Sequence, residues 1–165
     1  MIYSMNNTNR IMPERKFFGS GSGMYVKHLT THIPALSRPL NKGEQYLGRF
    51  IVPPFQRKFV WTIKQQQKLI ESIYLGLPIG IIIYNLPNVP TDTDFWLLDG
   101  QQRITTIIRY IDDCFPVNNY LYSQLPQEEQ NHFDRMTTQV YQTQFECEED
   151  CADIYNRLVY GGTPH

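Results

Sequence analysis

The stretch FWLLDGQQRITTIIRYI, residues 95–111, decides the fold, because an apolar run stops at Asp99-Gly100 and a helical pattern starts at once. This order predicts a strand, a tight glycine turn and the beginning of a helix. Isoleucine then recurs at the spacing i, i+3, i+4 and i+7, which directs one apolar stripe toward a core. The stripe consists of Ile104, Ile107, Ile108 and Ile111.

The polar start of this helix is a candidate anion site. Gln101, Gln102 and Arg103 fall in its first turn, where backbone N–H groups lack partners and the helix dipole concentrates partial positive charge. Phosphates bind readily at such ends. An ordinary turn, in which Gly100 serves geometry alone, explains the local pattern equally well, because the stretch has neither the GxxxxGK[ST] of a P-loop nor the GxGxxG of a dinucleotide fold.

The composition indicates one domain. A chain of 165 residues can bury a single core, and a net charge of −1 with 19% charged residues points neither to nucleic acid nor to an acidic partner. The distribution is uneven, since residues 1–64 hold ten lysines and arginines against two acids, and residues 65–165 hold five against fourteen. The basic part either meets phosphates or pairs with the acidic part on folding.

Cysteine and histidine usage predicts no metal centre. The three cysteines form neither an even set nor a ligand pattern, which favours a reducing cytoplasm without disulfides. His28 and His32 have the spacing of helical zinc ligands, but Leu29 occupies the position of the zincin glutamate, which argues against a metalloprotease. The polar start and short apolar runs predict no signal peptide and no membrane partner, and therefore a cytoplasmic protein.

Residues 1–45 are expected to form a flexible N-terminal arm, and residues 46–165 the folded domain. The arm is asparagine-rich and contains the run GSGSG at residues 19–23, which cannot bury enough apolar surface to stay ordered alone. A short element is expected within residues 25–36. The domain is expected to be α+β, with a mixed sheet and helices. Strands are predicted at 46–52, 80–84, 117–122 and 137–145, and helices after Thr62, after Pro126 and at 147–160.

Two further patterns concern the ends of the predicted helices. Thr62 and Gln65 form a capping box at the helix that follows the first strand. In the last helix, Cys147 and Cys151 are interpreted as core filling on the apolar face, and the acids around them as a solvated surface.

The segment PPFQRKFVW, residues 53–61, places polar and cationic groups among aromatic side chains. One interpretation is a hydrophobic staple into the next helix. The other is a preset phosphate or base contact through Arg57, whose guanidinium suits such ligands.

Four motifs, PPFQRKFVW, IESIYLGLPIG, LLDGQQRITT and IYNRLVYGGTPH, occur in an order and spacing that resembles a known family. The family is the GmrS-like N-terminal domain of modification-dependent restriction enzymes, in the ParB/sulfiredoxin-like superfamily, and the resemblance covers about residues 46–165. It implies a ParB-like fold in which the turn at residues 99–103 cradles nucleotide phosphates. It also implies that Gln56 and Arg57 face that pocket and that the segment from Arg157 to Gly162 closes it.

This resemblance suggests a role for each residue of the turn. The N–H groups of Gly100 to Gln102 and the guanidinium of Arg103 would hold phosphate oxygens, with Gln102 and Arg103 also catalytic candidates. Thr105 or Thr106 would add a hydroxyl. Asp99 would hold Mg²⁺ through water or orient an attacking water, as phosphoryl transfer requires.

Two departures from the family pattern bear on catalysis. Relatives are expected to carry asparagine where this chain has Val159, so binding of a nucleoside triphosphate is better supported than its hydrolysis. The family's restriction enzymes cut DNA with an appended HNH domain, and these residues leave no room for one, so autonomous nuclease activity is not expected.

Three functional interpretations remain open. The first is a nucleoside-triphosphate-binding domain, with slow NTPase activity as an option, that acts in DNA processing or modification-dependent restriction together with a nuclease. The second is a phage-encoded standalone binding protein that uses the same scaffold, without catalysis, against a host defence protein. The third is sequence-independent DNA binding by the basic N-terminal part, which salt should weaken steeply.

Overall fold

The computed structural model describes residues 11–13 and 19–161, and the elements below lie within them. A mixed sheet contains β1 (Gly19–Tyr25), β6 (Thr137–Thr143), β4 (Ile82–Asn85) and β5 (Leu97–Asp99), in that order. β6 pairs antiparallel with β1 and parallel with β4, and β4 pairs antiparallel with β5. A separate two-stranded hairpin consists of β2 (Gln45–Leu47) and β3 (Phe50–Val52).

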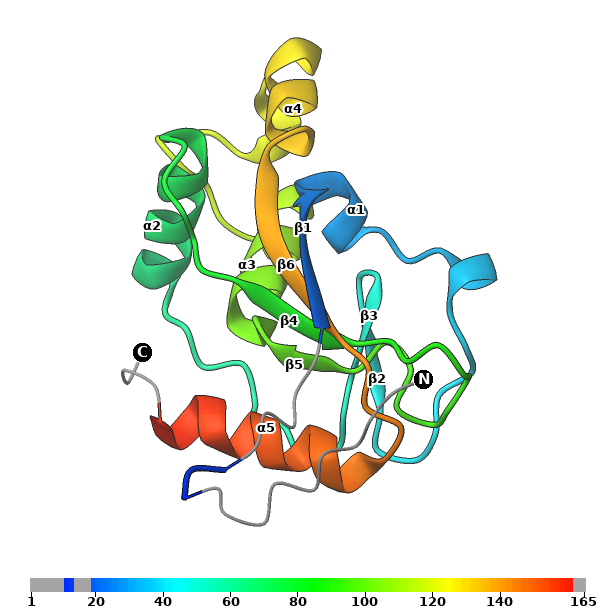
Figure 1. Cartoon of the computed structure of the whole chain (residues 1–165). Helices are drawn as coiled ribbons and strands as arrows, with labels where there is room; N and C mark the ends of the chain where they lie inside the picture. The colour runs from blue at the N-terminus through cyan, green and yellow to red at the C-terminus, as the bar shows by residue number, and fades with distance from the viewer. Residues whose placement is uncertain (1–10, 14–18, 162–165) are drawn as a thin grey trace.

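Helices cover this sheet (Figure 1). The longer ones are α2 (Ile63–Tyr74), α3 (Gln101–Ile111), α4 (Gln127–Asp134) and α5 (Glu148–Gly161). The short elements are α1 (Val26–Thr30) and the 3-10 turns η1 (Pro34–Leu36) and η2 (Tyr122–Gln124). The prediction of an α+β fold in a single domain is confirmed.

Alternation along β5 explains how α3 and α5 come to lie on different sides of it. Leu97 belongs to a buried cluster with Ile104 of α3 and with Ile82. Its neighbour Leu98 belongs to another buried cluster, with Cys151 of α5. Successive side chains of a strand point to opposite faces, so β5 is held between the two helices and its last residue, Asp99, is fixed where they converge.

Strand β1 differs from the sequence analysis, which assigns residues 19–23 to a flexible arm. The structure pairs β1 with β6 along its whole length, from Gly19 opposite Thr143 to Tyr25 opposite Thr137. A Gly/Ser run has little apolar surface of its own, and backbone hydrogen bonds to β6 order it instead. Residues 1–10 and 14–18 of the predicted arm lie outside the described residues.

The other elements confirm most expectations and correct some. Thr62 and Gln65 form the predicted capping box, and Pro126 precedes α4. The strand predicted over residues 46–52 is a hairpin instead, because Gly48 takes a φ of 56° and turns the chain between β2 and β3. The prediction of a strand at 117–122 is wrong, since Asn118 and Asn119 adopt left-handed conformations and bend the chain there.

The structure separates the two cysteines of the last helix. Cys151 is buried in the cluster with Leu98, as predicted, whereas Cys147 is exposed and contacts Asp150. The core-filling interpretation therefore holds for Cys151 only. Position 147 lies just before α5 begins, so it does not share the face that residue 151 presents to the sheet.

Candidate functional site

Gly100 creates the turn from β5 into α3. Its φ of 112° lies in the left-handed region, which side chains with a Cβ rarely adopt. A Cβ at this position would also come within 2.5 Å of the Cδ1 atom of Ile82. Glycine is therefore required both by the backbone conformation and by the packing of β4 beneath it. The turn directs the first N–H groups of α3 away from the sheet, with no helical partner for them.

Gln102 attaches the loop at residues 53–62 to helix α3. Its Oε1 accepts a hydrogen bond from the Val60 N–H at 2.9 Å, and its Nε2 donates to the Lys58 carbonyl at 3.2 Å. The side chain is buried. Both ends of the carboxamide are therefore engaged by the loop backbone, which gives Gln102 a positioning role, while its catalytic role stays a prediction.

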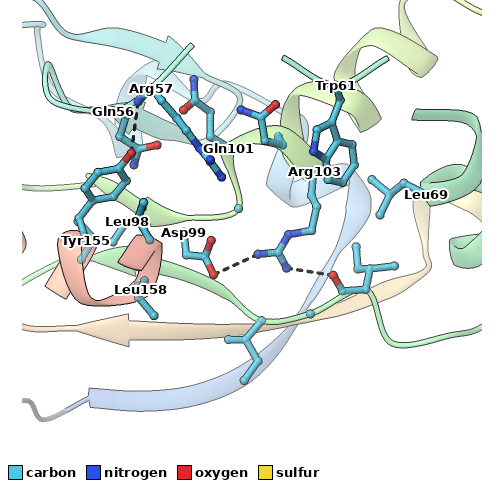
Figure 2. Close-up of a pocket in the computed structure, with 16 residues that line it drawn as sticks. Gln56, Arg57, Trp61, Leu69, Leu98, Asp99, Gln101, Arg103, Tyr155 and Leu158 are labelled. Carbon is cyan, nitrogen blue, oxygen red and sulfur yellow. Dashed lines mark hydrogen bonds and ion pairs between the residues drawn. The ribbon is translucent and has the colours of Figure 1, made fainter. Parts of the chain in front are cut away.

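The same loop is anchored at three more points. The Gln56 side-chain amide donates to the Leu97 carbonyl of β5. Phe55 packs against Trp96 and Tyr155, with ring centroids 5.4 and 5.1 Å apart. The Arg57 N–H donates to the Tyr155 hydroxyl at 3.3 Å. With its backbone held, the exposed Arg57 side chain extends toward the turn after β5 (Figure 2).

Arg103 in the first turn of α3 and Asp99 at the end of β5 form an ion pair, with 3.3 Å between Nη2 and Oδ2. The Arg103 Nη1 also donates to the Ile79 carbonyl at 3.0 Å. Burial lowers the pKa of Arg103, and the charge of Asp99 partly offsets this effect. Because the Arg103 side chain is only 14% exposed while that of Asp99 is 44% exposed, the carboxylate is the more accessible partner.

These groups surround a cavity of about 390 Å³ (Figure 2). One part of its wall is polar, and another is apolar, with Trp61, Leu69 and Ile79 close to Arg103. The size lies within the usual range for small-molecule sites. The lining residues are Gln56, Arg57, Trp61, Leu69, Ile79, Gly80, Ile81, Leu98, Asp99, Gly100, Gln101, Gln102, Arg103, Tyr155, Leu158 and Val159.

One buried polar atom of the lining has no partner. The Gln101 Oε1 accepts no hydrogen bond from any described group. A buried acceptor without a donor costs free energy, so a ligand that brings a donor to this atom would remove that cost.

Most of the residues proposed from the sequence meet at this cavity. Gln56, Arg57, Asp99 and the run from Gly100 to Arg103 all line it. Thr105 and Thr106 lie outside the lining. The Thr106 side chain is buried and its hydroxyl donates to the Gln102 carbonyl at 2.7 Å, within the helix.

The C-terminal helix contributes differently from the expectation. Val159 and Leu158 line the cavity, but Arg157 is exposed and pairs with Asp153 at 3.2 Å. Gly162, the end of the predicted closing segment, lies outside the described residues.

The sequence analysis missed two aromatic groups of the site. Trp61 was included in the aromatic segment at residues 53–61 without a role in the site, and Tyr155 was given no role. No spacing rule connects Tyr155 to residues 55–57, because the contact depends on the way that α5 crosses β5. For Trp61 a signal existed, since it directly precedes the capping box and so must lie near the start of α2.

The site offers few ligands for a metal ion. Among the described residues, no group of three or more histidine, cysteine and acidic side chains could hold one. Asp99 is the acidic residue in the cavity lining. Mg²⁺ commonly binds through one or two carboxylates plus substrate phosphates, so Asp99 fits such an ion only when phosphates complete its coordination.

Comparison with known proteins now places the chain. The sequence model for the N-terminal domain of the GmrSD restriction endonuclease matches residues 36–163. The chain belongs to this family. The match begins before the boundary predicted at residue 46 and includes every lining residue of the cavity. The wider placement in the ParB/sulfiredoxin-like superfamily stays a prediction.

A relative of this GmrSD-type domain is the uncharacterized protein MJ0686 of Methanocaldococcus jannaschii. It is 31% identical over 96 residues, a match that covers 45% of this chain and 17% of that protein. The chain therefore spans less than a fifth of the relative's length. No solved structure matches the chain. Within the described part of the chain, no helix is long and apolar enough to cross a membrane.

Proposed function

We propose that the cavity binds a nucleoside triphosphate and that the domain serves modification-dependent restriction, the activity for which its family is named. The observation that carries the proposal is the meeting of Arg57 with the N-terminal turn of α3 in one cavity. The free N–H groups at the positive end of the helix dipole and the guanidinium of Arg57 are two independent features that favour phosphate.

The apolar part of the cavity suggests the orientation in which a nucleotide would bind. Phosphates fit beside Arg57 and the N–H groups at the start of α3, and the base fits against the indole of Trp61 and the side chain of Leu69. The unpartnered Gln101 Oε1 would then accept a hydrogen bond from a ribose hydroxyl or from an amino group of the base.

Hydrolysis is the less strongly supported half of the proposal. Asp99 is partly exposed and borders the cavity, so it is the residue that would orient an attacking water or hold Mg²⁺. The ion would supply charge neutralisation for the phosphates. Gln102 is committed to the loop backbone, and Val159 offers no polar atom. A binding domain without turnover is therefore the second candidate. Its partner would be a host defence protein that it acts against, a nuclease that it assists, or DNA.

Calorimetric titration with ATP, GTP, CTP and UTP in the presence of Mg²⁺ tests the binding proposal. We expect Arg57→Ala to weaken binding at least tenfold, because a hydrogen bond to a charged group contributes about 1.5–3 kcal/mol. Lys58→Ala is the matched control, since Lys58 is exposed, carries the same charge and lies outside the cavity lining. Arg57 is preferred to Arg103 here, because loss of the buried Arg103 would also disturb the fold. Absence of binding by all four nucleotides would refute the proposal.

A phosphate-release assay on the same samples separates the two candidates. Turnover that is lost in Asp99→Asn, with binding retained, supports hydrolysis. Binding without any phosphate release supports the noncatalytic domain.

A further inference from the structure

A second cavity lies at the opposite end of α3 from the nucleotide site. It has a volume of about 840 Å³ and is formed by the end of α2, the end of α3, the turn at residues 117–120 and the start of α4. Three tyrosines line it, Tyr74, Tyr110 and Tyr120. We refer to this cavity as the tyrosine groove.

Aromatic side chains and hydroxyls form the floor of the tyrosine groove. Tyr74 and Tyr110 share a hydrogen bond of 2.9 Å between their hydroxyls, and their rings are perpendicular with centroids 6.3 Å apart. Tyr110 is almost completely buried, whereas Tyr120 is 55% exposed. A cation placed over an aromatic face is attracted by the ring quadrupole, so this arrangement favours positively charged groups.

Two carboxylates add negative charge. Glu71 of α2 and Glu129 of α4 both line the groove and are exposed. Burial, the hydrogen bond to Tyr110 and the charge of Glu129 all raise the pKa of Tyr74, which indicates that this carboxylate acts on the hydroxyl pair. Among the described residues, neither glutamate has an ion-pair partner, and no lysine or arginine lines the groove.

The helix ends that meet here have opposing effects. Carbonyl groups at the end of α2 favour a cation. The start of α4 favours an anion, but Glu128 and Glu129 in its first turn place full negative charges there. The balance therefore favours a cationic occupant.

Apolar side chains border the same groove. Leu75 is 75% exposed and Leu125 is partly buried, and both line it. A bound peptide can cover the exposed leucine side chain beside this groove, whereas a bound free ion would leave that side chain exposed to water. The combination fits a side chain that carries both an apolar stem and a positive head.

We propose that the tyrosine groove docks a basic segment of a partner protein, with an arginine or lysine side chain inserted among the tyrosines and neighbouring apolar side chains covering Leu75. Charge complementarity selects this occupant, because within the described part of the chain both glutamates lack an ion-pair partner and no positive residue lines the groove. The site shares no lining residue with the nucleotide cavity, so it requires no nucleotide.

Fluorescence anisotropy tests the proposal with a short fluorescein-labelled peptide of alternating leucine and arginine. We expect saturable binding that the double variant Glu71→Lys, Glu129→Lys weakens at least tenfold. The matched control is Glu148→Lys, Glu149→Lys, which changes the net charge equally at exposed positions of α5. It should change the affinity by less than twofold. Tyr120→Leu should weaken binding several-fold, while Tyr120→Phe should retain it, because phenylalanine keeps the aromatic face.

Three outcomes would overturn the docking proposal. One is no saturable binding of the peptide. Another is equal weakening by both double variants, which would show attraction by net charge alone. The third is displacement by argininamide at the affinity of the peptide itself, which would show a site for a small free cation. Unchanged circular dichroism of each variant excludes misfolding as the cause of a loss.

Discussion

Gly100 is the residue at which the backbone of the site is most constrained. Gly100→Ala should lower the free energy of unfolding by about 1–3 kcal/mol, because alanine disfavours a φ of 112° and its Cβ would contact Ile82. Gly76→Ala is the matched control, since Gly76 has a φ of 77° but no atom within 4 Å of the added Cβ. It should cost only about 1 kcal/mol. Urea denaturation measures both, and equal losses would show that the contact with Ile82 is unimportant.

Glu44 shows how a buried charge makes stability depend on pH. Its carboxylate receives hydrogen bonds from both Arg38 Nη atoms, at 2.9 and 2.7 Å, and from the Trp96 indole. Burial opposes ionisation, but the hydrogen bonds from Arg38, Trp96 and the Asn41 N–H outweigh it and lower the pKa of Glu44. A lowered pKa means that the stabilisation is present above the unfolded value, about 4.3, and is lost as the pH falls through the folded value.

Glu44→Gln should therefore be less stable than the parent protein by about 1–3 kcal/mol at pH 7, since it breaks a paired buried charge. The difference should shrink as the pH falls below about 4. Thermal unfolding between pH 3 and pH 7 measures it. A constant deficit for Glu44→Gln at all pH values would contradict the assigned role of the charge.

The loop at residues 53–62 keeps its shape through contacts with other elements. Gln102→Ala leaves the Val60 N–H and the Lys58 carbonyl without their partner, which should loosen the loop and speed tryptic cleavage after Arg57 and Lys58 several-fold. Mass spectrometry of timed digests locates the cut. Gln67→Ala removes a side-chain hydrogen bond from α2 to Pro116 instead, and should leave cleavage of this loop unchanged. Equal cleavage rates in the parent and in Gln102→Ala would show that Gln102 does not hold the loop.

Local patterns predicted the elements whose causes are local. The isoleucine spacing after Gly100 identified α3, and Thr62 with Gln65 identified the start of α2, because neighbouring residues alone decide these features. β1 was missed for the opposite reason. Its Gly/Ser sequence has no intrinsic strand preference, and only a distant partner, β6, orders it. The Gly48 turn was missed because a glycine in a short apolar run fits a strand and a hairpin alike.

In the candidate site too, local motifs predicted some residues, whereas tertiary packing decides the others. Arg57 and the turn at residues 99–103 carried recognisable motifs, so their place in the cavity was predicted. The engagement of Gln102 by the loop and the contact of Tyr155 with Phe55 depend on tertiary packing, which spacing along the chain does not reveal. A glutamine in a polar motif looks the same whether its amide binds a ligand or a backbone.

At the scale of the whole molecule, the cavity between Arg57 and the start of α3 joins segments that are far apart in sequence. A bound nucleotide should therefore slow amide hydrogen exchange in residues 56–61, 99–103 and 155–159 together, because a ligand that binds only the folded state suppresses local opening. Exchange mass spectrometry with and without saturating nucleotide checks this, with Arg57→Ala as control. Protection in only one of the three segments would show that the ligand does not bridge the cavity.

The position of β6 between β1 and β4 determines when the sheet can form during synthesis on the ribosome. β6 pairs with β1 and β4, which both precede it in the chain, and it leaves the ribosome only after α4. Until then the nascent chain holds β1 and β4 without the strand that joins them, so their edges stay open to other chains. α5 follows β6 in the chain and supplies Tyr155, Leu158 and Val159, so the pocket for a ligand is completed only after α5 has left the ribosome.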